Sequence, residues 1–181
     1  MKTLRSILSI FGVLLLSNSL FGQVMDTDII KGHMIADWER AKAYTKEYLD
    51  AMPEDGINFK PGIGLRTFAE QMLHMSQGTI GLIVSGTGAI PIFQGKSLEK
   101  MEEFKTKAAL TQVVIQTYDF AIKSIRDMDA SKMENLVKRG KFEVTQYDWL
   151  NKAFEHQTHH RGQTTIYLRL KGIKTPNEKL F

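Results

Sequence analysis

Three of the five histidines in this 181-residue chain lie within one short stretch, at positions 156, 159 and 160. His156 and His160 are four residues apart, so on an α-helix their side chains are neighbours on the same face. Two neutral imidazoles at this spacing can bind one divalent ion. Without an ion, an inward-facing pair would repel itself when protonated and leave ring nitrogens without partners when neutral. The spacing therefore predicts part of a metal site.

The helical stripe that carries this pair indicates which way it faces. Steps of three and four residues give a mostly apolar stripe, so we expect it to face the interior of the protein. Its members are Trp149, Ala153, His156, His160, Gln163, Tyr167 and Leu170. His159 falls on a more polar side of the same helix.

The third ligand has to come from another helix, and His74 is our candidate. The stripe through His74 continues with Gly78 and Gly81. A glycine inside a helix costs about 0.5–1 kcal/mol relative to alanine. We therefore expect either a close approach of two helices there or room for a ligand. Three protein ligands leave at least one position open, which is typical of catalytic rather than structural metal sites.

Other roles remain open for these histidines. A lone histidine in a core is usually hydrogen-bonded and inert, and histidine pairs four residues apart also occur on exposed helix faces. The helix lacks the HExxH pattern of zincin proteases, so that mechanism has no base in this sequence. His33 is interpreted as structural, and the alternative is a fourth metal ligand.

Several polar residues near these histidines are candidates for supporting roles. Glu70 is first a helix-capping residue and second a residue that could orient the His74 imidazole. Gln163 and Glu155 could each orient an imidazole on their own helix, and the alternative for Glu155 is a solvated role. Arg161 would either hold an anion beside the metal or pair with an acid on another helix, and we favour the ion pair.

Four long segments have the apolar periodicity of helices, and they would position these side chains. They span residues of about 26–52, 67–85, 97–128 and 145–171. Thr67 with Glu70, and Thr145 with Asp148, have the spacing of residues that cap a helix start. Residues 141–144 alternate between charged and apolar side chains and are expected to be extended. We predict an all-α fold, a four-helix bundle.

The first 22 residues have the features of a secretory signal peptide. Lys2 and Arg5 precede an apolar run, and Gly22 offers a small residue at the cleavage point. The run is short for a membrane span, which needs about 20 residues; a retained anchor is the alternative. We expect residues 1–22 to be removed and residues 23–181 to be an exported domain, periplasmic or secreted.

The composition excludes several classes of function. The chain has no cysteine, which excludes disulfides, cysteine-based zinc sites, iron–sulfur clusters and a cysteine nucleophile. The formal charge of +4 falls to +2 once Lys2 and Arg5 are removed. Without a run of basic residues interleaved with aromatics, we expect no nucleic-acid partner. We also expect no stable membrane insertion after signal cleavage.

Two segments of this sequence resemble motifs of a known family. Residues 156–163, HQTHHRGQ, resemble the HxxxHRGQ motif of the DinB/YfiT-like superfamily. Residues 66–74, RTFAEQMLH, resemble its R-S/T-x-x-E-x-x-x-H segment, and residues 167–172 resemble its usual ending. The resemblance extends from about residue 26 to residue 176.

This resemblance implies a four-helix bundle with up-down-down-up topology. It implies a divalent ion, zinc or nickel, held by His74, His156 and His160. Members of the superfamily often dimerise, so the resemblance also points to a homodimer. Most members of the superfamily have no established activity, and those that do are mainly thiol S-transferases. The predicted export departs from this pattern, because such transferases are expected in the cytosol, where small thiols are abundant.

We therefore expect an exported protein that binds one divalent metal ion through three histidines. The first hypothesis is a metal-dependent enzyme with a small-molecule substrate, which catalyses group transfer such as thiol S-transfer, or hydrolysis. The second is a non-catalytic exported protein that binds a metal or a small ligand. The third is a structural bundle in which the histidines satisfy one another.

Overall fold

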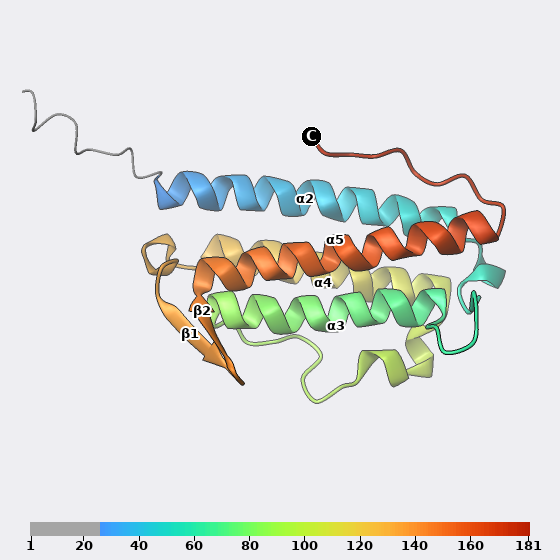
Figure 1. Cartoon of the computed structure of the whole chain (residues 1–181), viewed down its shortest axis with the longest axis horizontal. Helices are drawn as coiled ribbons and strands as arrows, with labels where there is room; N and C mark the ends of the chain where they lie inside the picture. Colours follow the sequence, from blue (N-terminus) through green and yellow to red (C-terminus); the bar gives the residue numbers. More distant parts are fainter. Residues whose placement is uncertain (1–25) are drawn as a thin grey trace, which may run out of the picture.

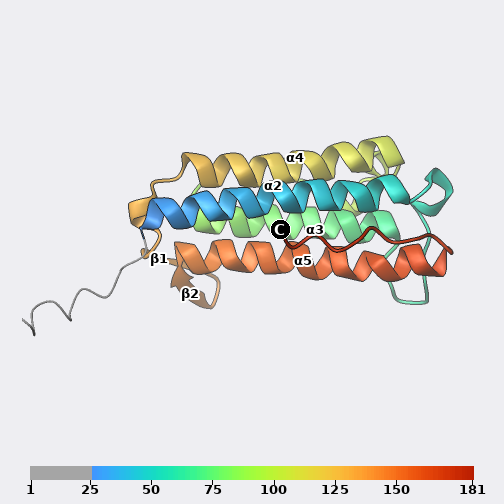
Figure 2. The same cartoon turned by 90° about the horizontal axis from the view of Figure 1, so that it is seen from above.

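The computed structural model describes residues 26–181, and their fold is mostly helical. Four long helices pack side by side, and a short hairpin lies at one end of them (Figures 1 and 2). The elements are α2 (Thr27–Ala51), α3 (Phe68–Thr87), α4 (Lys107–Asp127), β1 (Leu136–Arg139), β2 (Phe142–Thr145) and α5 (Gln146–Leu170). The predicted signal peptide, residues 1–22, lies outside the described residues. None of the described helices is long and apolar enough to cross a membrane.

Both capping pairs predicted from the sequence are confirmed. Thr67 Oγ1 accepts from the Glu70 backbone N–H at 3.1 Å, and Glu70 Oε2 accepts from the Thr67 N–H at 2.9 Å. The same reciprocal bonds join Thr145 and Asp148 at the start of α5. Each pair satisfies two backbone donors that a helix start would otherwise leave unpaired. Beyond α5, Gly172 adopts a left-handed φ of 71°, which suits glycine.

The predicted start of the third helix was wrong, because α4 begins at Lys107, about ten residues later than expected. Thr106 caps it, because its hydroxyl accepts a backbone N–H, whereas Ser97 makes no such bond. The intervening segment forms two 3-10 turns, Leu98–Lys100 and Glu102–Phe104. This segment leaves the bundle axis and places the Glu99 side chain against α3.

The extended segment predicted at residues 141–144 is confirmed, but its pairing partner was missed. Strands β1 and β2 pair antiparallel with Arg139 opposite Phe142, and Gly140 turns the chain with a φ of 59°. Trp149 Nε1 donates to the Val137 carbonyl oxygen at 3.0 Å, which ties the hairpin to α5. The hairpin thereby brings Arg139 to the surface of α3.

The core lies between the four helices, and it holds α3 against α5 in an antiparallel pair. Trp38 of α2 is buried and packs edge-on against Tyr118 and Phe154, with centroids 5.8 and 5.4 Å away. Burying a large apolar side chain contributes about 1.5–3 kcal/mol. Gly86 near the end of α3 meets Leu150 near the start of α5, and this contact admits no side chain at position 86. The close α3–α5 seam carries the histidines.

Candidate metal centre

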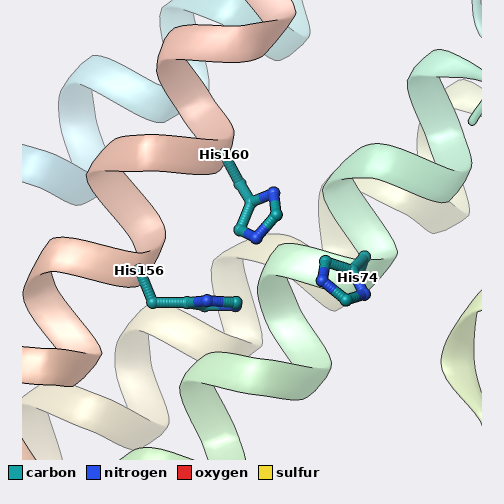
Figure 3. Close-up of side chains that lie close together, drawn as sticks. All are labelled: His74, His156 and His160. Atoms are coloured by element: carbon teal, nitrogen blue, oxygen red, sulfur yellow. The ribbon is translucent and has the colours of Figure 1, made fainter. Parts of the chain in front are cut away.

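The structure brings together the three histidines that the sequence singled out. His74 projects from α3, and His156 and His160 project from α5, into the space between the two helices (Figure 3). One ring nitrogen from each lies within 4.8 Å of the other two. The ring centroids are 4.6 Å apart for His74 and His160 and 4.4 Å apart for His156 and His160. Three imidazole nitrogens at this separation can share one divalent ion.

The site lies at the edge of the bundle rather than deep inside it. Of the stripe expected to face inward, the buried members are Trp149, Ala153, His160 and Tyr167. His156 is half-buried, whereas Gln163 and Leu170 are exposed, which corrects the expectation for that end of the helix. An ion held there would be reachable from solvent. His33 and His159 are exposed and do not join the group.

Gly78 explains how the His156 ring reaches this position. A Cβ atom at residue 78 would lie 2.1 Å from His156 Nε2 and 2.6 Å from its Cε1. Real Cβ atoms do not approach other atoms so closely, so the ring occupies space that only glycine leaves free. The close approach expected from the glycines of this stripe is therefore found at Gly78.

The Nε2 atom of His156 is buried and has no hydrogen-bond partner among the described residues. Leaving a buried polar nitrogen unpaired costs about 1–3 kcal/mol, and such atoms are rare in folded proteins. A metal ion between the three imidazoles would satisfy this nitrogen. The donor set therefore fits an ion.

Burial also holds two of the imidazoles in the form that binds metals. Loss of solvent, followed by the neighbouring histidines, lowers the pKa of His160 from 6.5 to about 4. The same causes, with burial first, lower the pKa of His156. Both rings are therefore neutral at neutral pH, and neutral imidazole is the metal ligand.

A glutamate that the sequence analysis did not select orients His74. The Nδ1–H of His74 donates to Glu99 Oε1 at 2.5 Å, and Arg66 Nε donates to Glu99 Oε2 at 2.7 Å. Burial raises the pKa of Glu99, but the hydrogen bonds from Arg66 and His74 outweigh it and leave this pKa below the usual 4.5. With Nδ1 carrying the proton, the Nε2 atom of His74 is available to an ion. A carboxylate behind a ligating imidazole is a common support of metal sites.

Two glutamine side chains contact the Nδ1 atom of His160. Gln163 Oε1 lies 3.0 Å from His160 Nδ1 and can accept its proton, which leaves Nε2 toward the other two histidines. Gln71, which is buried in α3, donates to Gln163 Oε1 and lies 2.7 Å from the same ring nitrogen. Gln163 was expected in this role, whereas Gln71 was missed.

The other three candidates for supporting roles contact none of the three imidazoles. Glu155 is exposed and pairs with Lys152 at 2.7 Å. Glu70 caps α3 and pairs with Lys105 at 3.3 Å, and its pKa is lowered first by the Thr67 backbone N–H. The buried Arg161 guanidinium lies 4.5 Å from the centroid of the Tyr44 ring and donates to Gln157 Oε1 at 3.1 Å. Among the described residues it has no carboxylate partner, so the ion pair that we favoured is not found.

A cavity of about 590 Å³ adjoins the site. Its wall includes Arg66, Glu99, Gln71 and Gln163, the polar residues that hold the ring nitrogens facing away from the ion position. Ile166 and other apolar side chains complete the lining. The site therefore has open space on one side of its supporting residues.

Comparisons with known proteins identify the family and the fold of this chain. The model of the DinB family matches residues 22–180. A DinB-like protein from Bacillus cereus has a similar structure with a TM-score of 0.69 and 18% identity, covering 81% of this chain and 95% of that one. For a DinB-like protein from Bacillus subtilis, the TM-score is 0.64 and the identity 16%, over 82% and 96% of the chains. A conserved protein from Enterococcus faecalis has a TM-score of 0.58 and 14% identity, over 78% and 96%.

At these identities the solved structures show a shared fold and nothing finer. No curated protein matches this sequence. The family model covers nearly all of the chain, including both histidine segments and the four described helices. The chain belongs to the DinB family.

Proposed function

We propose that this chain is an exported metalloprotein that holds one divalent ion through His74, His156 and His160 and uses it in catalysis. The observation that carries the proposal is the convergence of three ring nitrogens within 4.8 Å, one of them the unpartnered Nε2 of His156. Three imidazoles suit zinc or nickel. The proposed reaction class is group transfer, such as thiol S-transfer, or hydrolysis.

The chain's own residues would prepare the site for this chemistry. A bound divalent ion with an open position supplies Lewis acidity, which lowers the pKa of a thiol or a water. Glu99 accepts the Nδ1 proton of His74, and Gln163 Oε1 can accept that of His160, which leaves the nitrogens directed at the ion unprotonated. Arg66 keeps Glu99 ionised and in place. These contacts fix the ring orientations before a ligand arrives.

The proposal includes the cellular location and the partners of this domain. The signal-like leader, residues 1–22, supports export to the periplasm or the exterior. We propose a small-molecule substrate, no nucleic-acid partner, no stable membrane insertion and a homodimer.

The order of contacts between the helices supports the up-down-down-up topology. The end of α3 meets the start of α5, so these two helices are antiparallel. Lys42 of α2 pairs with Asp119 of α4, and Lys107 of α4 donates to the Asp50 carbonyl oxygen of α2, so α2 and α4 are antiparallel. Tyr48 near the end of α2 meets Thr165 near the end of α5, so these two helices are parallel.

A non-catalytic metal- or ligand-binding protein is the second candidate. The pairing of nearby acids favours it, because Glu99 is engaged by Arg66 and His74, and Glu70 is engaged by Lys105. Neither carboxylate is left as a free general base. Thiol transfer does not need such a base once the thiol is ionised at a metal, so this observation weighs mainly against hydrolysis.

Turnover separates the two candidates. Residues 23–181, loaded with zinc or nickel, are assayed for transfer of a small thiol to 1-chloro-2,4-dinitrobenzene and for hydrolysis of 4-nitrophenyl acetate. We expect metal-dependent thiol transfer that is lost in His156→Ala and retained in His159→Ala, whose ring lies outside the group. Stoichiometric metal binding with no turnover above the metal-free protein would replace the enzyme with the binding protein.

A further inference from the structure

A small hollow beside the metal centre is lined by two basic residues and no acidic one. It measures about 240 Å³ and lies between α3, the loop that follows it and the hairpin β1–β2. The two basic residues are Lys96 of the loop and Arg139 of β1. The other residues that line it include Gln77, Gly81 and Leu98. A concave surface with only positive charge favours a negatively charged ligand.

Neither basic residue is neutralised by the protein. Within residues 26–181, no carboxylate pairs with Lys96 or Arg139. Arg139 Nη1 donates to the Gly81 carbonyl oxygen and, at 3.0 Å, to Ser85 Oγ. These bonds fix the guanidinium against α3, while the donors on Nη2 and Nε make no hydrogen bond to a described residue. These two free guanidinium donors can bind a carboxylate or a phosphate through a pair of hydrogen bonds.

The loop side of the hollow is also fixed in place. Gln77 Nε2 donates to the Lys96 carbonyl oxygen at 3.2 Å, and Gln77 Oε1 accepts from the Leu98 N–H at 2.9 Å. The Gln77 amide of α3 thus holds the loop on both sides of Ser97. The hollow therefore has two walls that are each hydrogen-bonded to α3, with one cation on each wall. Lys96 Nζ lies 5.8 Å from the centroid of the Phe104 ring and has no carboxylate partner among the described residues.

The hollow and the metal centre lie one helical turn apart on α3. A Cβ atom at Gly81 would be 2.9 Å from Arg139 Nη2, and one at Gly78 would be 2.1 Å from His156 Nε2. Cβ positions three residues apart on a helix are about 5–6 Å from each other, so the two nitrogens are separated by no more than about 11 Å. A molecule with a few carbon atoms can therefore contact both.

We propose that the substrate is a small organic anion whose carboxylate, sulfonate or phosphate group binds between Arg139 and Lys96. Its reacting end, a thiol or an electrophilic centre, then reaches the ion held by the three histidines. This inference rests on the proposed function and narrows its substrate class. It makes Arg139 and Lys96 the residues that determine specificity, with no part in holding the ion.

Two thiols of similar size test the inference by binding alone. 3-Mercaptopropionate carries a carboxylate, and 2-mercaptoethanol is neutral. Both are titrated into residues 23–181 loaded with zinc, in buffer free of phosphate and sulfate, and the dissociation constants are measured by calorimetry. The compared quantity is the ratio of the two constants in each variant, which cancels the intrinsic difference in acidity. The variants are R139Q and K96Q, with R169Q as control because Arg169 is exposed on α5 and lines no part of the hollow.

We expect wild type and R169Q to prefer the anionic thiol by about tenfold or more, which is the effect of one charge-assisted hydrogen bond. R139Q should lose most of that preference and K96Q part of it, while both keep their metal and their helical circular dichroism. Equal ratios in wild type and R139Q would overturn the inference, with the metal site intact. If neither thiol binds, the inference also fails, and elemental analysis of the same sample shows whether the metal site has failed with it.

Discussion

Alanine in place of Gly78 gives a sharp perturbation of the metal centre. The new Cβ would lie 2.1 Å from His156 Nε2 and 2.6 Å from its Cε1, so the ring has to rotate away from α3. It cannot do so and keep its nitrogen near the other two, because His160 already lies 4.4 Å from it, centroid to centroid. Gly78→Ala should therefore remove one of three ligands without changing any of them chemically.

The expected effects on affinity and stability run in opposite directions. Loss of a residue that merely orients a ligand costs about 10–100-fold in metal affinity, so loss of a ligand should raise the zinc dissociation constant by more than about 100-fold. Helix propensity contributes about 0.5–1 kcal/mol in favour of alanine, and the displaced ring no longer buries an unpaired nitrogen. The metal-free variant should therefore be at least as stable as the wild type.

Gly162→Ala is the matched control for this experiment. Gly162 lies in the same α5 stretch as the ligands, but a Cβ there would meet nothing within 4 Å. This variant should gain the same helix propensity and keep its zinc affinity. Both are measured by zinc titration against a competing chelator, and stability is measured by urea unfolding of the metal-free proteins. Unchanged affinity in Gly78→Ala would refute the placement of His156 among the ligands.

Three further predictions concern residues around the site and the start of α4. Glu99→Gln should weaken zinc binding about 10–100-fold, measured by the same titration, whereas Glu103→Gln should leave it unchanged. Because the folded-state pKa of His160 is lowered to about 4, the unfolded chain binds more protons between pH 6.5 and 4. The metal-free protein should be most stable above pH 6.5 and lose stability as the pH falls toward 4, with a shallower decline in His160→Ala, as followed by urea unfolding. Thr106→Ala should cost about 1 kcal/mol of unfolding free energy, and Ser97→Ala less than about 0.5 kcal/mol; equal costs would place the start of α4 elsewhere.

The parts of the fold that follow from local chemistry were predictable. Thr67 with Glu70 and Thr145 with Asp148 mark helix starts, because a cap acts within one turn. The pairing of His156 with His160 also follows from helical spacing, and the glycines after His74 indicated a close approach of two helices or room for a ligand. These local rules sufficed for the four helices and for the histidine pair, whereas the choice of His74 rested on its glycine stripe and on the resemblance to the family.

The residues that were missed depend on contacts between distant segments. Glu99 reaches His74 only because residues 98–104 leave the helix axis, while its acidic neighbours favoured a reading as the first turn of a helix. Gln71 binds across to α5, and no spacing within α3 indicates a partner 92 residues away. Arg139 is brought to α3 by a hairpin of which only one strand had a recognisable alternation.

The metal content of the purified domain tests the central claim most directly. Residues 23–181 are purified without chelators or nickel resin, reconstituted with zinc or nickel, and analysed by elemental mass spectrometry beside alanine variants of single histidines. We predict about one ion per chain in the wild type and in His159→Ala, and loss of that ion in His74→Ala, His156→Ala and His160→Ala. No ion above background in the reconstituted wild type, or full occupancy in His156→Ala, would contradict the three-histidine site.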